Sequence, residues 1–383
     1  MSTKPSVVIP VCEPVIGERE RAYVRDCLES NWISAGGKYT RAFEATFSRY
    51  CGATHGIACV NGTAAIHLAL SALGVGPGDE VIVPSFTLIV AATTAALTGA
   101  RAVLVDVDPA TWCLDPARLE AAITPRTKAI LPVHMYGHPC DMDPILSIAN
   151  RHGIAVIEDA AEAHGAEYKG RRVGAIGHIG CFSFYSNKLV TTGEGGMVVT
   201  NDAALAARVR LLANQAFEEP RFVHRFMGFN YRLSDLLAAI GLGQCEEIED
   251  KVRRKRELAT WYTELLQAEG DLTLPTEAPW ARSVYWMYGV VVEEGFGASR
   301  DGVMRRLLRE GIETRPFFHP LHRQPLFVDS SDPRFPETKG EFPVSERLGA
   351  RGLYLPSGLG LTRAQVKQVV AELRACRGGG EWR

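Results

Sequence analysis

The stretch EVIVPSFTLIVAATTAALTGARAVLVDVD, residues 80–108, decides the fold. It contains two short, nearly continuous apolar runs, EVIVP and ARAVLVD, on either side of the helical pattern LIVAATTAAL. Short Val- and Ile-rich runs of this kind predict strands that are buried on both faces, and the segment between them predicts a covering helix. A strand, a helix and a second strand in this order form the unit from which parallel sheets are built.

The same alternation extends from Gly56 to about Asn214. TKAILPV and IAVIEDA are further strand-like runs, and LDPARLEAAI and DPILSIANRHG have apolar residues at helical spacing. We therefore expect an α/β fold with a mostly parallel central sheet wrapped by helices. After it, Ser234 suits the N-cap of one long helix that continues to Gln267.

The length of 383 residues suits one large domain and a smaller companion. We expect a large domain over residues 15–243 and a smaller C-terminal α+β domain over residues 244–383, which residues 1–14 could join. In the second part VYWMYGVVVEE predicts a strand, and GVMRRLLREG and LTRAQVKQVVAELRAC predict helices. The basic run KVRRKR follows acidic residues at helical spacing, which predicts a solvated helix face.

Composition excludes several classes of protein. With 42 basic and 44 acidic residues, the formal charge of −2 favours neither nucleic acid nor a membrane surface as a partner. No apolar run predicts a signal peptide or a membrane span. Nine scattered cysteines without a CxxC pair predict reduced thiols and a cytoplasmic location, with no disulfide framework. The histidines lack metal-ligand spacing, so we expect no metal. The sequence has no GxGxxG motif at a strand–helix turn, which argues against a Rossmann oxidoreductase.

Three features lie where parallel sheets bind ligands. The strand-like run IAVIED ends in Asp159, which places a carboxylate at the carboxyl end of a strand. Asn61-Gly62-Thr63 joins a strand-like run to a helical stretch, and the free amide groups at a helix start bind phosphate. Lys188 lies in CFSFYSNKLVTTGEGGMVVTND, residues 181–202, between an aromatic strand and a glycine-rich return.

Taken singly, each feature is more often structural: a turn former, a plain helix cap and a solvated lysine. Together they are the parts that a pyridoxal 5'-phosphate (PLP) enzyme requires. The lysine forms a Schiff base with the cofactor aldehyde, the carboxylate keeps the pyridine nitrogen protonated, and the amide cradle holds the phosphate. A lysine amine kept away from water has a lowered pKa and can act as a base. The return contains Gly193, Gly195 and Gly196, which would let the backbone pass close to the cofactor.

The sequence resembles the DegT/DnrJ/EryC1/StrS family of sugar aminotransferases, which belongs to the fold-type I, aspartate aminotransferase-like class. The resemblance covers nearly the whole chain. It is carried by NWISAGGKYTRAFEATFSRY, VNGTAAIHLAL, IEDAAEAHGA, CFSFYSNKLVTTGEGGMVVTND, MGFNYRLSDLLAAIGLGQ and RPFFHPLH.

The resemblance implies that Lys188 binds the cofactor and moves a proton between its C4' carbon and the substrate. Relatives that act as dehydratases have histidine there, so Lys188 indicates transamination. Asp159 would pair with the pyridinium nitrogen. The other implied cofactor contacts are Gly62, Thr63, Ala64 and Ser183 at the phosphate, Ala161 and Leu88 at the ring, Glu162 near the ring hydroxyl, and Asn230 from the neighbouring subunit of a homodimer with shared active sites.

Two positions depart from the family pattern. Leu88 stands where many relatives have an aromatic residue over the ring, with Phe86 two places earlier, so apolar contact would replace stacking. Glu162 is often glutamine in relatives.

The resemblance also implies a substrate class. The amino donor would be L-glutamate, the acceptor a nucleotide-diphosphate keto-sugar, and pyridoxamine phosphate the intermediate. ETRPFFHPLHRQPLF resembles the same segment in 4-keto-6-deoxysugar aminotransferases, which suggests conversion of GDP-4-keto-6-deoxymannose to GDP-perosamine. The implied substrate contacts are Trp32, Ser34, Arg315, His319 and His322. A proline-braced surface loop with solvated histidines is the simpler explanation of that segment.

Two other functions remain open at this point. One is a 3-keto-sugar or keto-cyclitol aminotransferase of the same family, which would differ in pocket residues. The other is a non-catalytic PLP-binding regulatory protein, which the presence of Lys188, Asp159 and Ser183 disfavours.

Overall fold

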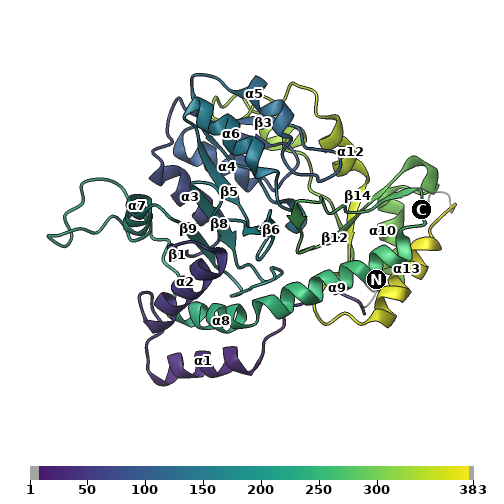
Figure 1. The fold of residues 1–383 in the computed structure, drawn as a ribbon, viewed down its shortest axis with the longest axis horizontal. Coiled ribbons are helices and arrows are strands. Elements are labelled where there is room, and N and C mark those ends of the chain that lie inside the picture. The colour runs from purple at the N-terminus through teal and green to yellow at the C-terminus, as the bar shows by residue number, and fades with distance from the viewer. Residues whose placement is uncertain (1–7, 379–383) are drawn as a thin grey trace.

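The computed structural model describes residues 8–378 and is built around a seven-stranded sheet in the order β1-β9-β8-β5-β4-β2-β3 (Figure 1). In this sheet β9 is antiparallel to both of its neighbours, and the other paired strands are parallel. Its strands are β1 (His55–Cys59), β2 (Glu80–Pro84), β3 (Arg101–Val105), β4 (Thr127–Ile130), β5 (Ala155–Asp159), β8 (Ile179–Ser183) and β9 (Gly196–Thr200).

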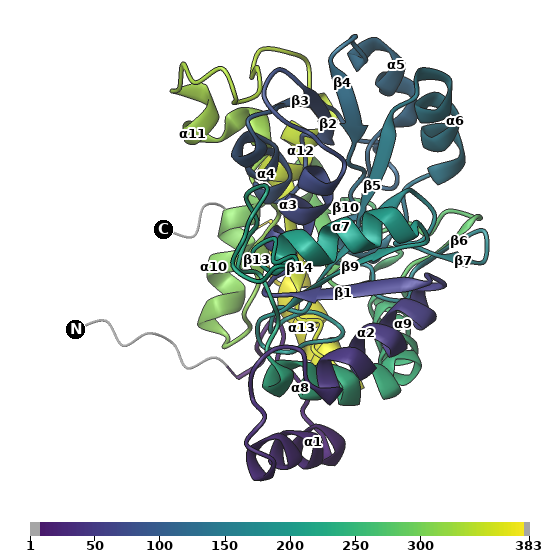
Figure 2. The ribbon, with the colours of Figure 1, turned by 90° about the vertical axis from the view of Figure 1, so that its left-hand side faces the viewer.

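Both faces of this sheet are covered. Met197 and Val198 are neighbours in β9, and because successive strand residues point to opposite faces, they belong to two different hydrophobic cores. The predicted α/β fold with a mostly parallel sheet is therefore confirmed. The helices around the sheet are α2 (Lys38–Cys51), α3 (Gly62–Ala72), α4 (Val90–Thr98), α5 (Leu119–Ala122), α6 (Met142–His152), α7 (Ala203–Ala213) and α8 (Asp235–Glu246). A further helix, α1 (Glu18–Glu29), packs on α8 (Figure 2).

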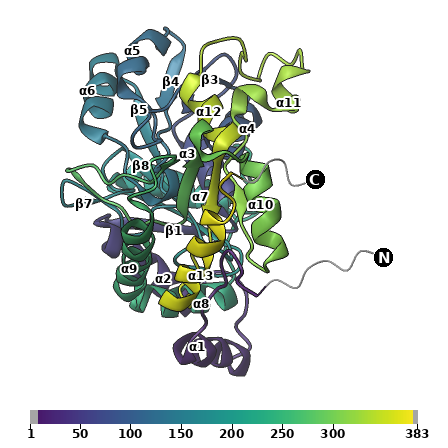
Figure 3. The ribbon, with the colours of Figure 1, turned by 90° about the vertical axis from the view of Figure 1, so that its right-hand side faces the viewer.

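A smaller antiparallel sheet, β10-β12-β14-β13, lies across the molecule from β1 and has its own core (Figures 1 and 3). Its strands are β10 (Leu272–Thr273), β12 (Tyr288–Val292), β13 (Arg315–Pro316) and β14 (Gly352–Leu355). The helices in this part are α9 (Ile248–Leu266), α10 (Arg300–Arg309), α11 (Pro325–Val328), α12 (Pro343–Arg351) and α13 (Arg363–Arg374). A third sheet joins β11 (Ala281–Arg282), β6 (Glu167–Tyr168) and β7 (Arg171–Arg172), and short 3-10 turns span Pro116–Arg118, Met135–Gly137, Glu294–Phe296 and Leu321–Arg323.

The single long helix predicted after Ser234 is two helices. The Ser234 hydroxyl caps α8 as predicted, but the chain leaves helical geometry at Glu247, with φ −118° and ψ 15°, before α9 begins. Figure 1 shows α9 running from α8 to the smaller sheet. The prediction of a solvated basic face on α9 is wrong for two of its lysines, because the structure leaves Lys251 7% and Lys255 2% exposed.

The described N-terminal residues pack on the smaller sheet. Ile9 forms a parallel bridge with Ile312, and the Ser357 N–H donates to the Val11 carbonyl at 2.8 Å. Residues 1–7 of the predicted joining segment lie outside the described residues. The predicted boundary at residue 243 falls inside the last turn of α8, and the division into two domains stays a prediction.

A buried carboxylate joins the edge strand of the large sheet to α12. Asp106 follows β3, and it accepts hydrogen bonds from the N–H groups of Val344 at 3.0 Å and Ser345 at 2.9 Å and from the Ser345 hydroxyl. These groups belong to the first turn of α12, whose N–H groups have no partners within the helix and favour a negative charge. Asp106 therefore anchors α12 to the large sheet.

Asp106→Asn is expected to lower the free energy of unfolding by about 1–3 kcal/mol, because the amide lacks the negative charge and can accept fewer of the three hydrogen bonds. Urea unfolding followed by circular dichroism would measure the change. Asp332→Asn is the matched control, since Asp332 forms a local ion pair with Arg334 two residues away. Equal stability of the Asp106 variant and the wild type would show that this anchor contributes nothing.

Candidate active site

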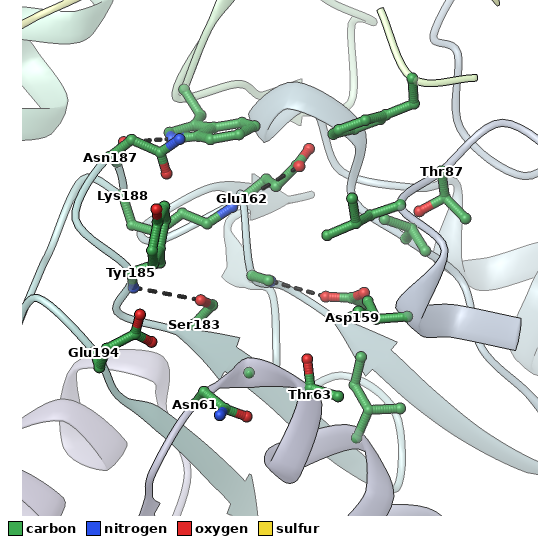
Figure 4. Close-up of a pocket in the computed structure, with 18 of the residues that line it drawn as sticks. Asn61, Thr63, Thr87, Asp159, Glu162, Ser183, Tyr185, Asn187, Lys188 and Glu194 are labelled. Atoms are coloured by element: carbon green, nitrogen blue, oxygen red, sulfur yellow. Dashed lines mark hydrogen bonds and ion pairs between the residues drawn. The ribbon is translucent and has the colours of Figure 1, made fainter. Parts of the chain in front are cut away.

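A pocket of about 350 Å³ opens at the carboxyl edge of the parallel strands, where α/β sheets bind ligands. Figure 4 shows Asp159, Ser183 and Lys188 facing the same space, above the start of α3. The site residues predicted from the sequence that line the pocket are Gly62, Thr63, Leu88, Asp159, Ala161, Glu162, Ser183 and Lys188.

The amine of Lys188 is held away from water at the centre of this pocket. The lysine lies in the connection between β8 and β9, and its Nζ is 3.9 Å from Glu162 Oε1 and 3.8 Å from the centre of the Trp286 ring. Burial lowers the pKa of Lys188, and the nearby carboxylates of Glu162 and Asp159 partly oppose this shift. The amine is consequently a stronger candidate for a base near neutral pH than a solvated lysine would be.

Two acidic side chains lie beside this amine. Asp159 is the last residue of β5, and its Oδ1 accepts a hydrogen bond from the Ala161 N–H at 3.1 Å. Burial raises its pKa, while the Ala161 N–H and Lys188 act in the opposite direction. Glu162 Oε2 accepts from the Tyr136 N–H at 2.9 Å, and burial raises the pKa of Glu162 to about 7. A cation bound next to these two carboxylates would therefore be stabilised by them, and a neutral group would not.

The start of α3 forms a narrow cradle against β8. Asn61 is the N-cap, and its Oδ1 accepts from the Ala64 N–H at 2.8 Å. Ala64 was predicted as a phosphate contact, but its N–H is committed to Asn61 and it does not line the pocket. A Cβ at Gly62 would lie 2.7 Å from the Ser183 Cβ, so glycine is needed for the helix start to approach Ser183 this closely.

Two of the glycines after Lys188, Gly195 and Gly196, allow close contacts within the chain. A Cβ at Gly196 would lie 2.3 Å from the Asn61 carbonyl oxygen, and one at Gly195 would lie 2.3 Å from the Thr192 hydroxyl. The absence of a side chain at Gly196 therefore lets the start of β9 pack directly against the backbone of Asn61. Gly195 and Gly196 thus make room for neighbouring residues. A Cβ at Gly193, whose φ is +83°, would meet no heavy atom within 4 Å, so the expectation that it lets the backbone pass close to the cofactor stays a prediction.

Leu88 lies at the pocket, as predicted, while Phe86 does not. Phe86 is fully buried and packs against the rings of Tyr136, Phe317 and Phe318 in the core. The apolar side chain facing the pocket at this point is therefore Leu88.

Other lining residues were missed from the sequence. Trp286, Phe318 and Tyr354 come from the C-terminal part of the chain and lie far from the quoted motifs in sequence. Their apolar character is typical of core residues, so no local signal separated them from the rest. Asn61 also lines the pocket, within the predicted Asn61-Gly62-Thr63 segment, and the further lining residues that were not predicted are Ile66, Thr87, Val90, Val133, Tyr185, Asn187 and Glu194.

The predicted substrate residues of the C-terminal part have other partners in this chain. His322 Nδ1 is 2.7 Å from the Ser85 hydroxyl, and its Nε2 is 3.3 Å from Glu346 Oε1, so both ring nitrogens are engaged. The Arg315 guanidinium forms an ion pair with Glu313 at 2.5 Å. Neither His322 nor Arg315 lines the pocket.

The remaining predicted contacts also lie outside the lining of this pocket. His319 Nε2 donates to the Arg323 carbonyl at 2.9 Å, and Asn230 Oδ1 accepts hydrogen bonds from the Arg232 guanidinium. Trp32 is more than half exposed, and Ser34 lies two residues after it. Their predicted roles, like those of His322 and Arg315, stay predictions.

A buried hydrogen-bond network supports the strand that carries Asp159. Glu158 accepts hydrogen bonds from the N–H groups of Gly174 at 2.7 Å, Ile176 at 2.7 Å and Gly177 at 2.6 Å, and it lies 3.0 Å from His134 Nε2. The backbone of His134 in turn donates to the Asp159 carbonyl at 3.0 Å. The network therefore fixes the backbone around Asp159 from both sides of β5.

The residues present fit PLP on structural grounds. The cradle at Gly62 has no room for a side chain, the buried amine of Lys188 faces the pocket, and a strand-end carboxylate lies beside it. The buried Oδ1 of Asn187, a lining residue, has no hydrogen-bond partner among the described residues and can accept from a ligand. Within residues 8–378 no cluster of three or more His, Cys, Asp or Glu side chains is arranged to hold a metal ion.

The raised pKa of Glu162 predicts a pH-dependent stability of the cofactor-free protein. The folded state binds this proton more tightly than the unfolded state, so the contribution is fully present below about pH 4.5 and is lost as the pH rises through about 7. Between about pH 4.5 and about pH 7, the free energy of unfolding of the wild type should fall by about 2–3 kcal/mol more than that of Glu162→Gln.

Urea unfolding of both proteins at about pH 5 and about pH 7.5 would measure this difference. Glu194→Gln is the control, because Glu194 is an exposed lining residue and should leave the pH dependence unchanged. Parallel curves for the wild type and Glu162→Gln would contradict a raised pKa.

Comparison with known proteins places this geometry in a family. Residues 14–374 match the DegT/DnrJ/EryC1/StrS aminotransferase family. GDP-perosamine synthase of Caulobacter vibrioides is 47% identical over 367 residues, which cover 95% of this chain and 97% of that protein. GDP-perosamine synthase of Escherichia coli O157:H7 is 41% identical over 359 residues, covering 94% and 95%.

A solved structure extends the likeness to three dimensions. The crystal structure of S. venezuelae DesV in complex with a ketimine intermediate is 37% identical, covers 94% of both chains and has a TM-score of 0.87. The fold-type I class and the family resemblance expected from the motifs are thereby confirmed. This chain belongs to the DegT/DnrJ/EryC1/StrS aminotransferase family.

Proposed function

We propose that this chain is a PLP-dependent aminotransferase that moves the amino group of L-glutamate to C4 of a nucleotide-linked 4-keto-6-deoxysugar. The acceptor we favour is GDP-4-keto-6-deoxymannose, which would give GDP-perosamine. The observation that carries the proposal is the amine of Lys188, buried 3.9 Å from Glu162 and beside the strand-end Asp159. Two relatives that cover nearly the whole chain and are named GDP-perosamine synthase support the choice of sugar.

When bound, PLP supplies an aldehyde that takes up an amino group and a ring that accepts electrons from the reacting carbon. Lys188 would hold that aldehyde through its Nζ and, once released, move a proton at the same atom. Asp159 would keep a proton on the ring nitrogen. The helix start at Gly62 and Thr63, with the Ser183 hydroxyl, would hold the phosphate.

The wall of the pocket suits a deoxysugar. Trp286, Phe318 and Tyr354 give one side of the site a largely apolar surface. An acceptor whose sixth carbon is a methyl group loses less solvation on this surface than one that carries a hydroxyl group.

We propose a homodimer with shared active sites. The loop between α7 and α8 projects from the body of the molecule in Figure 1 and carries strongly exposed apolar side chains, including Phe222 at 72% and Met227 at 87%. Exposed apolar clusters of this kind are typical of protein interfaces. Asn230 lies at the base of this loop, where it bridges to Asn214. It lies outside the pocket of its own chain, so a second copy is the partner whose site it would complete.

The expected location is the cytoplasm. All nine cysteines are free, which suits a reducing compartment. Within residues 8–378, the helices are too short or too polar to span a membrane.

The purified protein loaded with PLP should show a visible absorption band that is lost on adding glutamate. It should then aminate GDP-4-keto-6-deoxymannose faster than nucleotide-linked 3-keto sugars or keto-cyclitols, with product identified by mass spectrometry. Lys188→Ala should lose both the band and at least about 10³-fold in rate, because the amine that binds and moves protons is missing.

Lys169→Ala is the control for this substitution, since Lys169 forms an exposed ion pair with Asp143. Turnover by Lys188→Ala would contradict the proposed role of the lysine. A preference for a 3-keto sugar or a keto-cyclitol would instead retain the chemistry and overturn the choice of acceptor.

Shared sites can be tested by mixing two inactive variants. In a mixed dimer of Lys188→Ala and Asn230→Ala, one of the two sites has an intact lysine and an intact asparagine from opposite chains. Co-expression should therefore restore about a quarter of the wild-type activity, since about half of the dimers are mixed and each has one working site. If both residues act within one chain, or if the protein is a monomer, mixing restores nothing.

A further inference from the structure

Trp286 has a contact with Lys188 that the family motifs do not include. The Lys188 Nζ lies 3.8 Å from the centre of the Trp286 ring, well within the range in which an aromatic face attracts a cation. Trp286 is 3% exposed, so this attraction operates with little screening by water. The tryptophan comes from the segment just before β12, about a hundred residues after the lysine.

Two hydrogen bonds hold Trp286 in place, one at its ring and one at its backbone. Its Nε1–H donates to the Asn187 carbonyl at 2.7 Å, which ties the ring to the residue next to Lys188. The backbone carbonyl of Trp286 accepts from the buried Lys255 Nζ at 2.7 Å. The ring plane therefore cannot turn away from the amine without breaking a buried hydrogen bond.

Several other titratable groups face the same amine. Glu162 and Asp159 come from β5 and the turn after it, and Cys12 comes from the N-terminal segment. His164, from the segment after β5, is fully buried and its pKa is lowered to about 3 by burial and then by Lys188. His164 is thus neutral near pH 7, whereas Glu162, whose pKa is about 7, is ionised there in about half of the molecules.

We propose that Trp286 is a positioning residue for Lys188, whose indole face holds the free amine on the Glu162 side of the pocket. A lysine side chain has four flexible bonds, and fixing it costs conformational entropy. The ring face above and the Glu162 carboxylate 3.9 Å away leave the ammonium one favourable place. Trp286 would thereby return the amine to the same point after each release.

This role rests on the proposed part of Lys188 in catalysis, but it can be tested without cofactor or substrate. The cofactor-free protein is treated with trace acetic anhydride over a range of pH, and mass spectrometry of the Lys188 peptide gives the midpoint at which the amine becomes reactive. The ring stabilises the ammonium form, so its removal should lower the pKa of Lys188. Trp286→Leu, which keeps the site apolar, should lower the midpoint by roughly 0.5 to 1.5 pH units.

Three further variants make the result decisive. Trp286→Phe keeps an aromatic face and should recover most of the shift, whereas Trp286→Met, which fills the space flexibly, should behave like leucine. Trp261→Leu is the matched control, because Trp261 lies under the Arg254 guanidinium on α9 and is remote from the pocket. Near-ultraviolet circular dichroism would confirm that each variant is folded.

An unchanged midpoint in folded Trp286→Leu or Trp286→Met would overturn the proposal. So would an equal fall in Trp286→Phe and Trp286→Leu, which would assign the effect to the indole N–H alone. Either result would leave the proposed transamination unaffected, since the labelling reads the amine directly. Conversely, an enzyme that fails to transfer amino groups would leave the labelling result valid.

Discussion

Exclusion of water from one amine is the constraint on which the rest of the site depends. The Lys188 ammonium loses hydration when it is buried. Attraction to the nearby Glu162 carboxylate and the Trp286 ring compensates for only part of this desolvation free energy. The balance leaves the amine easier to deprotonate than an exposed lysine. The two carboxylates next to it are destabilised in their charged forms for the same reason. Proton positions in the pocket are consequently linked to one another, and a change at one group alters the others.

The parts of the fold that could be predicted are those whose cause is local. Strands buried on both faces have to be apolar along their whole length, so the runs at β2, β3 and β5 were recognisable in the sequence. Parallel strands end at one edge, so the sequence alone predicts that Asp159 and the start of α3 lie close together. The cradle at Gly62 followed from the same rule.

The parts that could not be predicted depend on contacts between distant segments. Trp286 has the sequence environment of an ordinary core residue, and only the packing of β12 against the large sheet brings it to the pocket. Lys251 and Lys255 fit a solvated helix face by their spacing, but both are buried. Lys251 lies near Glu20 of α1 and Cys245 of α8, and the Lys255 amine donates to the backbone carbonyls of Trp286 and Ser357. The break at Glu247 does not coincide with a change of core, because Ile248 and Val252 at the start of α9 still pack in the core that α8 belongs to.

The ring that covers Lys188 also has a consequence for the order in which the protein is made. The cradle, Asp159 and Lys188 are all part of the growing chain once residue 188 has been added, whereas Trp286 is added about a hundred residues later. Until β12, the strand that follows Trp286, pairs with β14, the Trp286 ring does not cover the amine, which is open to solvent. A growing chain therefore carries this lysine exposed to water, and without the lowered pKa of the folded site, for the time needed to add roughly 170 further residues, which at about 5–20 residues per second is on the order of ten seconds.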